Sequence, residues 1–234
     1  TLYSYALGLS FLIVAFLSPI LSAIADYTGN KKRFMQFFCL LGSISVMSLY
    51  FFTGKENIWI GIVFAMLASI GFWGSIVFYN AYLPEVAEPE DHDRVSAKGF
   101  MLGYAGSVLL LAFNLSMVMK PDLYGITDST LPARISFLTV GIWWFGFAQL
   151  TFSRLPNNPF KRKPAKDFIF KGYRELQLVL KEIKSQGQLK ILLISFFLYS
   201  IGVQAVILLA STFGTKDLGL EDQNLIITIL LIQI

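Results

Sequence analysis

The 234-residue chain is 55% hydrophobic, contains 22 phenylalanines and carries a formal net charge of +4. This apolar content exceeds what the core of a soluble domain can bury, so the composition excludes a soluble globular protein and favours a membrane protein. The basic residues lie between apolar runs and form no basic face, which argues against nucleic acid as a partner, and the single cysteine, Cys39, excludes a disulfide within the chain.

Six apolar stretches are long enough to cross a hydrocarbon core of about 30 Å, and none contains an Asp, Glu, Lys, Arg or His. In chain order they are 3–25, 34–53, 58–83, 99–119, 135–153 and 191–213. A seventh stretch begins near Asn224 and is too short to cross. Because the hydrophobicity is continuous rather than alternating, we expect an all-α integral membrane protein with six complete transmembrane helices and part of a seventh.

The charges between these stretches predict the orientation, because successive loops lie on opposite sides of the membrane. The loops 26–33, 84–98 and 154–190 hold 15 of the 19 Lys and Arg residues. The other set of loops holds only Lys55, Lys120, Arg134 and Lys216. Cytoplasmic loops carry the excess of basic residues, so the first set is predicted to be cytoplasmic. The first stretch then runs inward, and we expect an internal part of a longer protein.

The long loop 154–190 begins with prolines among basic residues, which is typical of a linker. Apolar residues at helical spacing follow, at Ile169, Tyr173, Leu176, Leu180 and Ile183. This spacing predicts an amphipathic helix. The helix lies either on the inner membrane surface or against its own bundle as a connector.

The first cytoplasmic loop reads SAIADYTGNKKR over residues 22–33. It resembles the Gly-x-x-x-Asp-basic-x-Gly-basic-basic signature between spans two and three of the major facilitator superfamily. Asp26, Gly29 and Lys31 match this signature. The departures from it are Ser22, Tyr27 and Asn30. If the first stretch is span two, the loop 154–190 falls where the superfamily has its central linker.

Two segments are similar to one branch of this superfamily, the vacuole effluxers or autophagy-related permeases and their bacterial relatives. These segments are PILSAIADYTG at 19–29 and GVQAVILLASTFG at 202–214. The resemblance implies two six-helix halves that rock around a central cavity. The chain then divides into residues 1–153 as spans two to six, 154–190 as the cytoplasmic linker, and 191–234 as span seven with part of span eight.

The loop around Asp26 contains the groups that a two-state gate needs. A carboxylate at the inner end of one helix can accept hydrogen bonds from the N-terminus of a neighbouring helix and so latch one state. Gly29 permits a tight turn, and Lys31, Lys32 and Arg33 can pair with anionic head groups or with carboxylates of the adjoining loop. The alternative is a generic cytoplasmic turn whose charges only set the topology.

The second cytoplasmic loop is acidic and contains the only histidine. Its ionisable residues include Glu85, Glu88, Glu90, Asp91, His92 and Asp93. Their spacing matches no pattern of metal ligands, so we predict a solvated loop with His92 exposed, no bound metal and no cofactor.

Glycines and one proline inside the apolar stretches suggest how the helices pack. Gly99, Gly103 and Gly106 place small surfaces on one helix face, which predicts close helix approach. Pro19 frees one backbone carbonyl, which predicts either a hinge or a fixed bend.

Polar groups within the apolar stretches are candidates for a solute path, because an unpaired polar group facing lipid is costly. The resemblance implies that spans four and seven line the cavity, and it selects as candidate substrate-binding residues Trp73, Tyr79, Asn80 and Gln204. It does not select Asn114 or Gln149. Each of these residues can instead form an interhelical hydrogen bond.

Together these features predict a secondary active transporter that exports a small solute by alternating access, and the resemblance to vacuole effluxers implies amino acids. Its partners are the solute, the lipid bilayer and a coupling proton or ion, although the visible spans contain no carboxylate to carry a proton. Short loops favour a bacterial plasma membrane, with a vacuolar membrane as the alternative. The rival interpretations are a non-transporting receptor or scaffold on the same fold and a membrane-embedded enzyme.

Overall fold

The computed structural model describes residues 2–156, 174, 177–178 and 181–232, and every element assigned within these ranges is a helix. The long helices are α1 (Leu2–Thr28), α2 (Lys31–Ser48), α3 (Ile58–Asn80), α5 (His92–Met119), α6 (Leu131–Arg154) and α8 (Gly187–Lys216). The shorter ones are α4 (Leu83–Val86), α9 (Asp222–Ile232) and 3-10 turns at Leu49–Phe51, Lys55–Asn57, Pro89–Asp91 and Pro121–Tyr124. Six of the described helical segments are long and apolar enough to cross a membrane. The predicted all-α membrane fold is thereby confirmed.

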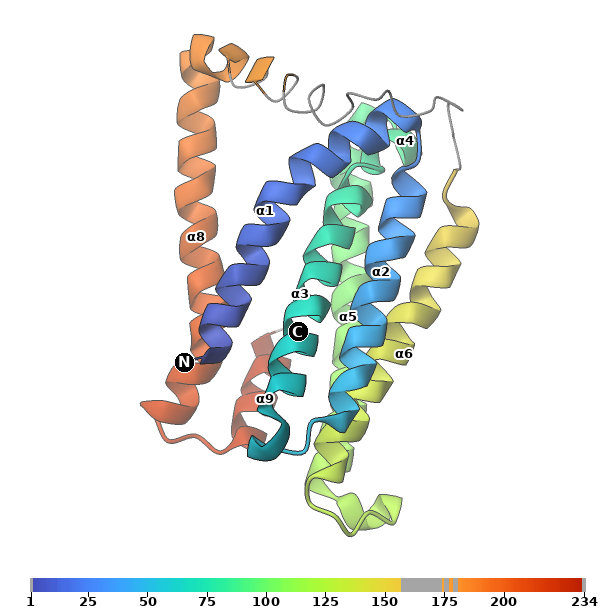
Figure 1. The fold of residues 1–234 in the computed structure, drawn as a ribbon, viewed down its shortest axis with the longest axis vertical. Helices are drawn as coiled ribbons and strands as arrows, with labels where there is room; N and C mark the ends of the chain where they lie inside the picture. The colour runs from blue at the N-terminus through green and yellow to red at the C-terminus, as the bar shows by residue number, and fades with distance from the viewer. Residues whose placement is uncertain (1, 157–173, 175–176, 179–180, 233–234) are drawn as a thin grey trace.

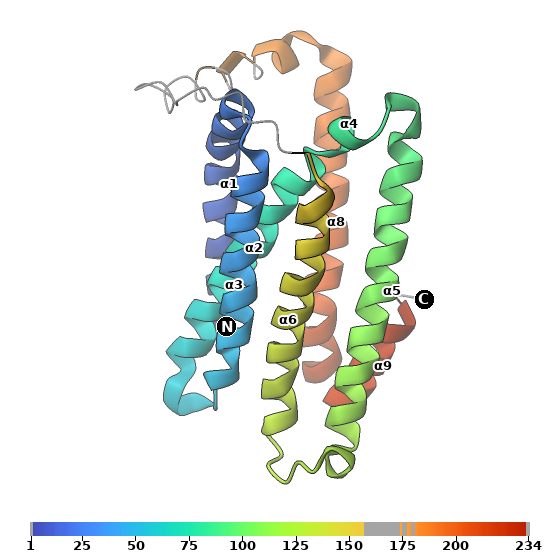
Figure 2. The same ribbon diagram turned by 90° about the vertical axis from the view of Figure 1, so that its right-hand side faces the viewer.

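The helices α1, α2, α3, α5 and α6 run side by side along the long axis of the molecule (Figures 1 and 2). α2 lies at the centre of the packing, because it contacts both α3 and α6, and α1 adds to this group through α3. α5 packs on α6, and α9 reaches α5. The main contact of α8 is with α9, so α8 stands at the edge of the bundle (Figure 1).

Glycines set the closest contacts of α2 with its two main neighbours. A Cβ on Gly71 of α3 would overlap the backbone of Gly42 in α2. A Cβ on Gly141 of α6 would lie 2.8 Å from the carbonyl oxygen of Ser43. Lipid tails are as apolar as leucine, so membrane helices associate largely through such close van der Waals packing. These glycines therefore permit the close packing of α2 on α3 and α6, and they are not among the glycines predicted from the sequence to pack closely.

The glycines that the sequence analysis selected lie in α5, in looser surroundings. A Cβ on Gly99 would lie 3.1 Å from the hydroxyl of Tyr79, and one on Gly106 would lie 3.9 Å from Trp143 Nε1. A Cβ on Gly103 would meet nothing within 4 Å. Close approach of helices at these three positions stays a prediction. The first helix continues through Pro19, whose role as a hinge also stays a prediction.

Asn114 joins two helices. The hydroxyl of Thr139 in α6 donates to Asn114 Oδ1 in α5 at 2.8 Å, and the Asn114 side chain is buried. The amide of Gln149 instead donates to the Phe145 carbonyl of its own helix at 3.3 Å. The interhelical hydrogen bond considered for Asn114 is confirmed.

The segment between α3 and α5 differs from the predicted cytoplasmic loop. α3 ends at Asn80, α4 follows, and α5 begins at His92 rather than near residue 99. Its first turns are a polar helix stabilised by Asp93 near the positive end of the helix dipole and by an Arg94–Asp91 ion pair of 3.0 Å. The prediction that His92 is exposed is wrong. Its ring is partly buried, with Nε2 3.1 Å from the Ala87 carbonyl oxygen.

No group of three or more His, Cys, Asp or Glu side chains within the described ranges could hold a metal ion. Most of the linker and most of the amphipathic helix predicted within 169–183 lie outside the described residues.

The buried core lies at one end of the bundle, where α1, α2, α3 and α6 meet. It is formed by Ala25, Met35, Phe38, Cys39, Phe78, Tyr82 and Phe152. The ring of Phe78 stacks on Phe34 and Phe38, with centroid distances of 5.3 and 6.0 Å. This packed end supports the turn between α1 and α2 and therefore fixes the position of the charged residues described next.

Candidate functional site

The turn between α1 and α2 is a helix C-terminal cap built on Gly29. Gly29 has a φ of 68°, in the left-handed region, and the N–H of Asn30 donates to the Ala25 carbonyl at 3.1 Å. This six-to-one hydrogen bond is the mark of a Schellman cap. A residue with a Cβ is strained at this φ, which accounts for the glycine. The turn brings Asp26 and Lys31 within contact distance.

Lys31 connects this turn to α4. Its Nζ lies 3.1 Å from Asp26 Oδ1 and 2.9 Å from Oε1 of Glu85 in α4. The exposed fractions of the side chains are 21% for Lys31, 31% for Glu85 and 62% for Asp26, so the pair with Glu85 is the better shielded from water and salt. The carboxylate of Asp26 was expected to accept hydrogen bonds from a helix N-terminus. Its contact in the described part of the chain is with Lys31 instead.

Lys32 and Tyr82 hold the C-terminal end of α6. Lys32 Nζ donates to the Leu155 carbonyl at 3.1 Å, and the hydroxyl of Tyr82 donates to the Pro156 carbonyl at 3.5 Å. The last carbonyls of a helix lack partners within it and form the negative end of its dipole, so an ammonium group is favoured there.

Tyr82 is almost fully buried, and its surroundings keep it a hydrogen-bond donor. Burial raises the pKa of the Tyr82 phenol, and the neighbouring carboxylate of Glu85 raises it further, against smaller opposing effects of Lys31 and Lys32. The phenol therefore stays protonated at neutral pH. Five residues thus form one connected set, which we call the inner cluster: Asp26, Lys31, Lys32, Tyr82 and Glu85.

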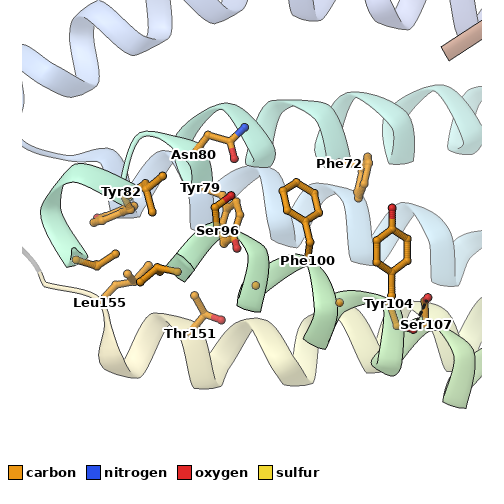
Figure 3. Close-up of a pocket in the computed structure, with 15 residues that line it drawn as sticks. Phe72, Tyr79, Asn80, Tyr82, Ser96, Phe100, Tyr104, Ser107, Thr151 and Leu155 are labelled. Atoms are coloured by element: carbon orange, nitrogen blue, oxygen red, sulfur yellow. Dashed lines mark hydrogen bonds between the residues drawn. The ribbon is translucent and has the colours of Figure 1, made fainter. Parts of the chain in front are cut away.

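A pocket of about 560 Å³ opens beside the inner cluster, between α3, α4, α5 and α6 (Figure 3). The aromatic rings of Phe72 and Tyr79 in α3 face those of Phe100 and Tyr104 in α5. The polar residues of its wall include Asn80, Ser96, Ser107 and Thr151. A mainly apolar and aromatic pocket with a few polar groups is typical of sites for small molecules.

The four candidate substrate-binding residues do not all lie at this pocket. Tyr79 and Asn80 line it. The ring of Trp73 lies outside it, edge-on to Phe11 at a centroid distance of 5.8 Å. Gln204 is exposed on α8, away from this pocket. The structure therefore brings two of the four together.

The pocket also contains residues that the sequence analysis did not select, among them Ser96, Phe100 and Tyr104. Ser96 precedes the predicted membrane span 99–119. Phe100 and Tyr104 are one helical turn apart, which places them on the same face of α5. This spacing of two aromatic residues could have predicted a pocket wall. The same spacing is equally typical of a helix face that contacts lipid.

One family model and several known proteins are similar to this chain. The family model described as vacuole effluxer Atg22 like matches residues 1–234. The chain is 30% identical over 231 residues to the uncharacterized MFS-type transporter YxiO of Bacillus subtilis, covering 98% of this chain and 53% of that protein. It is 27% identical to autophagy-related protein 22-1 of Aspergillus clavatus, covering 66% of this chain and 35% of that protein.

A third relative, autophagy-related protein 22 of Yarrowia lipolytica, is 21% identical and covers 100% of this chain and 51% of its own length. The chain thus spans about half the length, or less, of these curated relatives. No solved structure matches the chain.

Proposed function

We propose that this chain, which belongs to the vacuole effluxer Atg22-like family, forms part of a secondary active transporter that exports a small solute by alternating access. The matching family is named for a vacuole effluxer and the Bacillus subtilis relative is named a transporter, and neither name is that of an enzyme. The observation that carries the proposal is the position of Lys31 between Asp26 and Glu85, in the same inner cluster as Tyr82, which lines the pocket. Amino acids, the class that the resemblance to vacuole effluxers implies, are the proposed substrates.

In this proposal the inner cluster acts as a gate on the cytoplasmic side. A gate needs contacts that form in one state and break in the other, with a small difference in free energy between the states. Ion pairs that are partly exposed contribute only about 0–1 kcal/mol, so the contacts of Lys31 can form and break within a transport cycle. Gly29 fixes the turn, and Lys31, Lys32 and Arg33 supply its positive charge.

We also propose how the chain is divided and where the solute passes. Residues 1–153 form spans two to six of the first half, 154–190 the cytoplasmic linker, and 191–234 the start of the second half. The path is lined by Trp73, Tyr79, Asn80 and Gln204, with the last of these approaching the others in a state in which the two halves close. The bacterial relative supports a bacterial plasma membrane as the location.

The test is flux of a labelled amino-acid mixture through proteoliposomes that contain the full-length protein, with and without a proton gradient. We expect saturable flux in the wild type and a loss of up to about fivefold in Asp26→Asn, with little change in thermal stability, because an exposed ion pair contributes about 0–1 kcal/mol. The matched control is Glu90→Gln, which removes an exposed carboxylate of the same cytoplasmic surface and should leave flux unchanged.

Two outcomes would count against the proposal. Wild-type flux in Asp26→Asn would contradict the role of Asp26 in a gate. Absence of flux for every amino acid would contradict amino acids as the substrate class. In the same assay Gln204→Ala should change the apparent KM more than the amount of folded protein. An unchanged KM with less protein would mean that Gln204 serves only in packing.

A further inference from the structure

Arg33 differs from the two lysines that precede it in the chain. Lys31 binds the carboxylates of Asp26 and Glu85, and Lys32 binds the carbonyl of Leu155. The Arg33 side chain is exposed and has no hydrogen bond or ion pair with any residue in the described part of the chain. The turn therefore presents one exposed guanidinium that is available to bind a ligand.

An apolar groove of about 410 Å³ lies next to Arg33, beside the turn that joins α1 to α2. Its lining consists of Leu21, Asn30, Arg33, Phe34, Phe37 and Phe38. The two polar residues lie at the cytoplasmic end, and the other walls are apolar. At 1.5 Å per residue, Leu21 lies roughly 10 Å from the end of α1, so the groove runs from the membrane surface into the apolar part of the span.

We propose that this groove binds one anionic phospholipid of the cytoplasmic leaflet. The phosphate would lie against Arg33 and the side-chain amide of Asn30, and an acyl chain would lie along Leu21, Phe34 and Phe37. A guanidinium binds phosphate oxygens in a bidentate, charge-assisted manner, and basic pockets between transmembrane helices on this side are suited to lipid head groups. A soluble anion would satisfy Arg33 but leave the apolar walls of the groove uncovered.

Charge complementarity favours an anionic phospholipid over a zwitterionic lipid or a peptide. Asp26 and Glu85 supply two negative charges against the three positive charges of Lys31, Lys32 and Arg33, so one positive charge remains. Arg33 and Asn30 flank the two lysines of the inner cluster in the sequence, so a bound head group would also stabilise the turn that Gly29 closes. The lipid would thus favour the conformation in which the inner cluster is formed. The inference concerns binding alone and does not depend on the transported substrate.

The experiment measures thermal unfolding of the purified full-length protein in detergent while a short-chain lipid is added. Dioctanoyl phosphatidylglycerol is the probe, and dioctanoyl phosphatidylcholine and inorganic phosphate are the comparison ligands. We expect a saturable rise of Tm with phosphatidylglycerol only. Arg33→Gln should weaken its apparent affinity about tenfold or more, since hydrogen bonds to charged groups are the stronger class.

Matched variants separate this site from general attraction to a basic surface. Lys98→Gln removes the same charge from an exposed position at the start of α5 and should leave the affinity unchanged. Phe37→Ala should weaken binding without changing any charge, and Arg33→Lys should retain part of it, so the test does not rest on the folding of one variant. Equal losses in Arg33→Gln and Lys98→Gln, equal effects of the two lipids, or an equal effect of inorganic phosphate would each overturn the proposal.

Discussion

At the residue scale, Gly29 has a left-handed backbone conformation that is unfavourable for residues with a Cβ. With φ at 68°, an added Cβ costs about 1–2 kcal/mol. Gly29→Ala should therefore lower the Tm of the purified protein. The control is Gly146→Ala in α6, where a Cβ would meet nothing within 4 Å and alanine is the better helix former by about 1 kcal/mol. Equal destabilisation by both variants would show that the turn adopts another conformation in solution.

Part of the inner cluster could be predicted from local sequence, because a turn is a local structure. Asp26, Gly29 and Lys31 lie within six positions of one another, and the short spacing was enough to place them together. The sequence predicts a carboxylate of the adjoining loop as a partner of Lys31, but it does not identify which one. The partner is Glu85, which lies 54 positions away in the chain. The link from Lys32 to Leu155 spans 123 positions and was not anticipated at all.

At the element scale, the contact of α2 with α3 depends on the absence of side chains at Gly42 and Gly71. A Cβ at residue 71 would meet backbone atoms of α2, which cannot rotate away, so the two helices must separate. Gly71→Ala should lower the free energy of unfolding by about 1–3 kcal/mol, the usual cost of overpacking. Gly103→Ala, where the space is open, should have little effect on thermal stability. A Tm loss at Gly103 as large as at Gly71 would instead support close helix approach at α5.

The number and approximate positions of the helices could be predicted because long apolar runs have a fixed minimum length in a bilayer. The choice of packing faces could not. In a membrane both the lipid-facing and the buried side chains are apolar, so hydrophobicity does not distinguish the face of α2 that meets α6 from the face that meets lipid. Glycines distinguish these faces by shape, and shape is not visible in a hydropathy pattern.

At the scale of the whole molecule, the basic loops predict which end of the bundle faces the cytoplasm. The inner cluster and the core lie at that end, while residues 120–130 lie at the other. In the full-length protein, Glu88→Cys should react with a membrane-impermeant maleimide only from the cytoplasmic side, and Asp122→Cys only from outside. The native Cys39 is 2% exposed, so it should give little background. The opposite pattern would reverse the orientation and move Arg33 to the outer leaflet.

The position of α2 also has a consequence for the order of assembly during synthesis. Its contacts with α3 involve a segment that follows soon afterwards in the chain, but its contacts with α6 wait for residues 131–154. Until α6 enters the membrane, the side of α2 that receives Trp144 and Gly141 is covered by lipid alone. In a ribosome-bound chain that stops before residue 131, α1, α2 and α3 should therefore already be packed against one another. The core would still lack Phe152 of α6. Quality-control proteases and insertion chaperones would encounter the protein in that form.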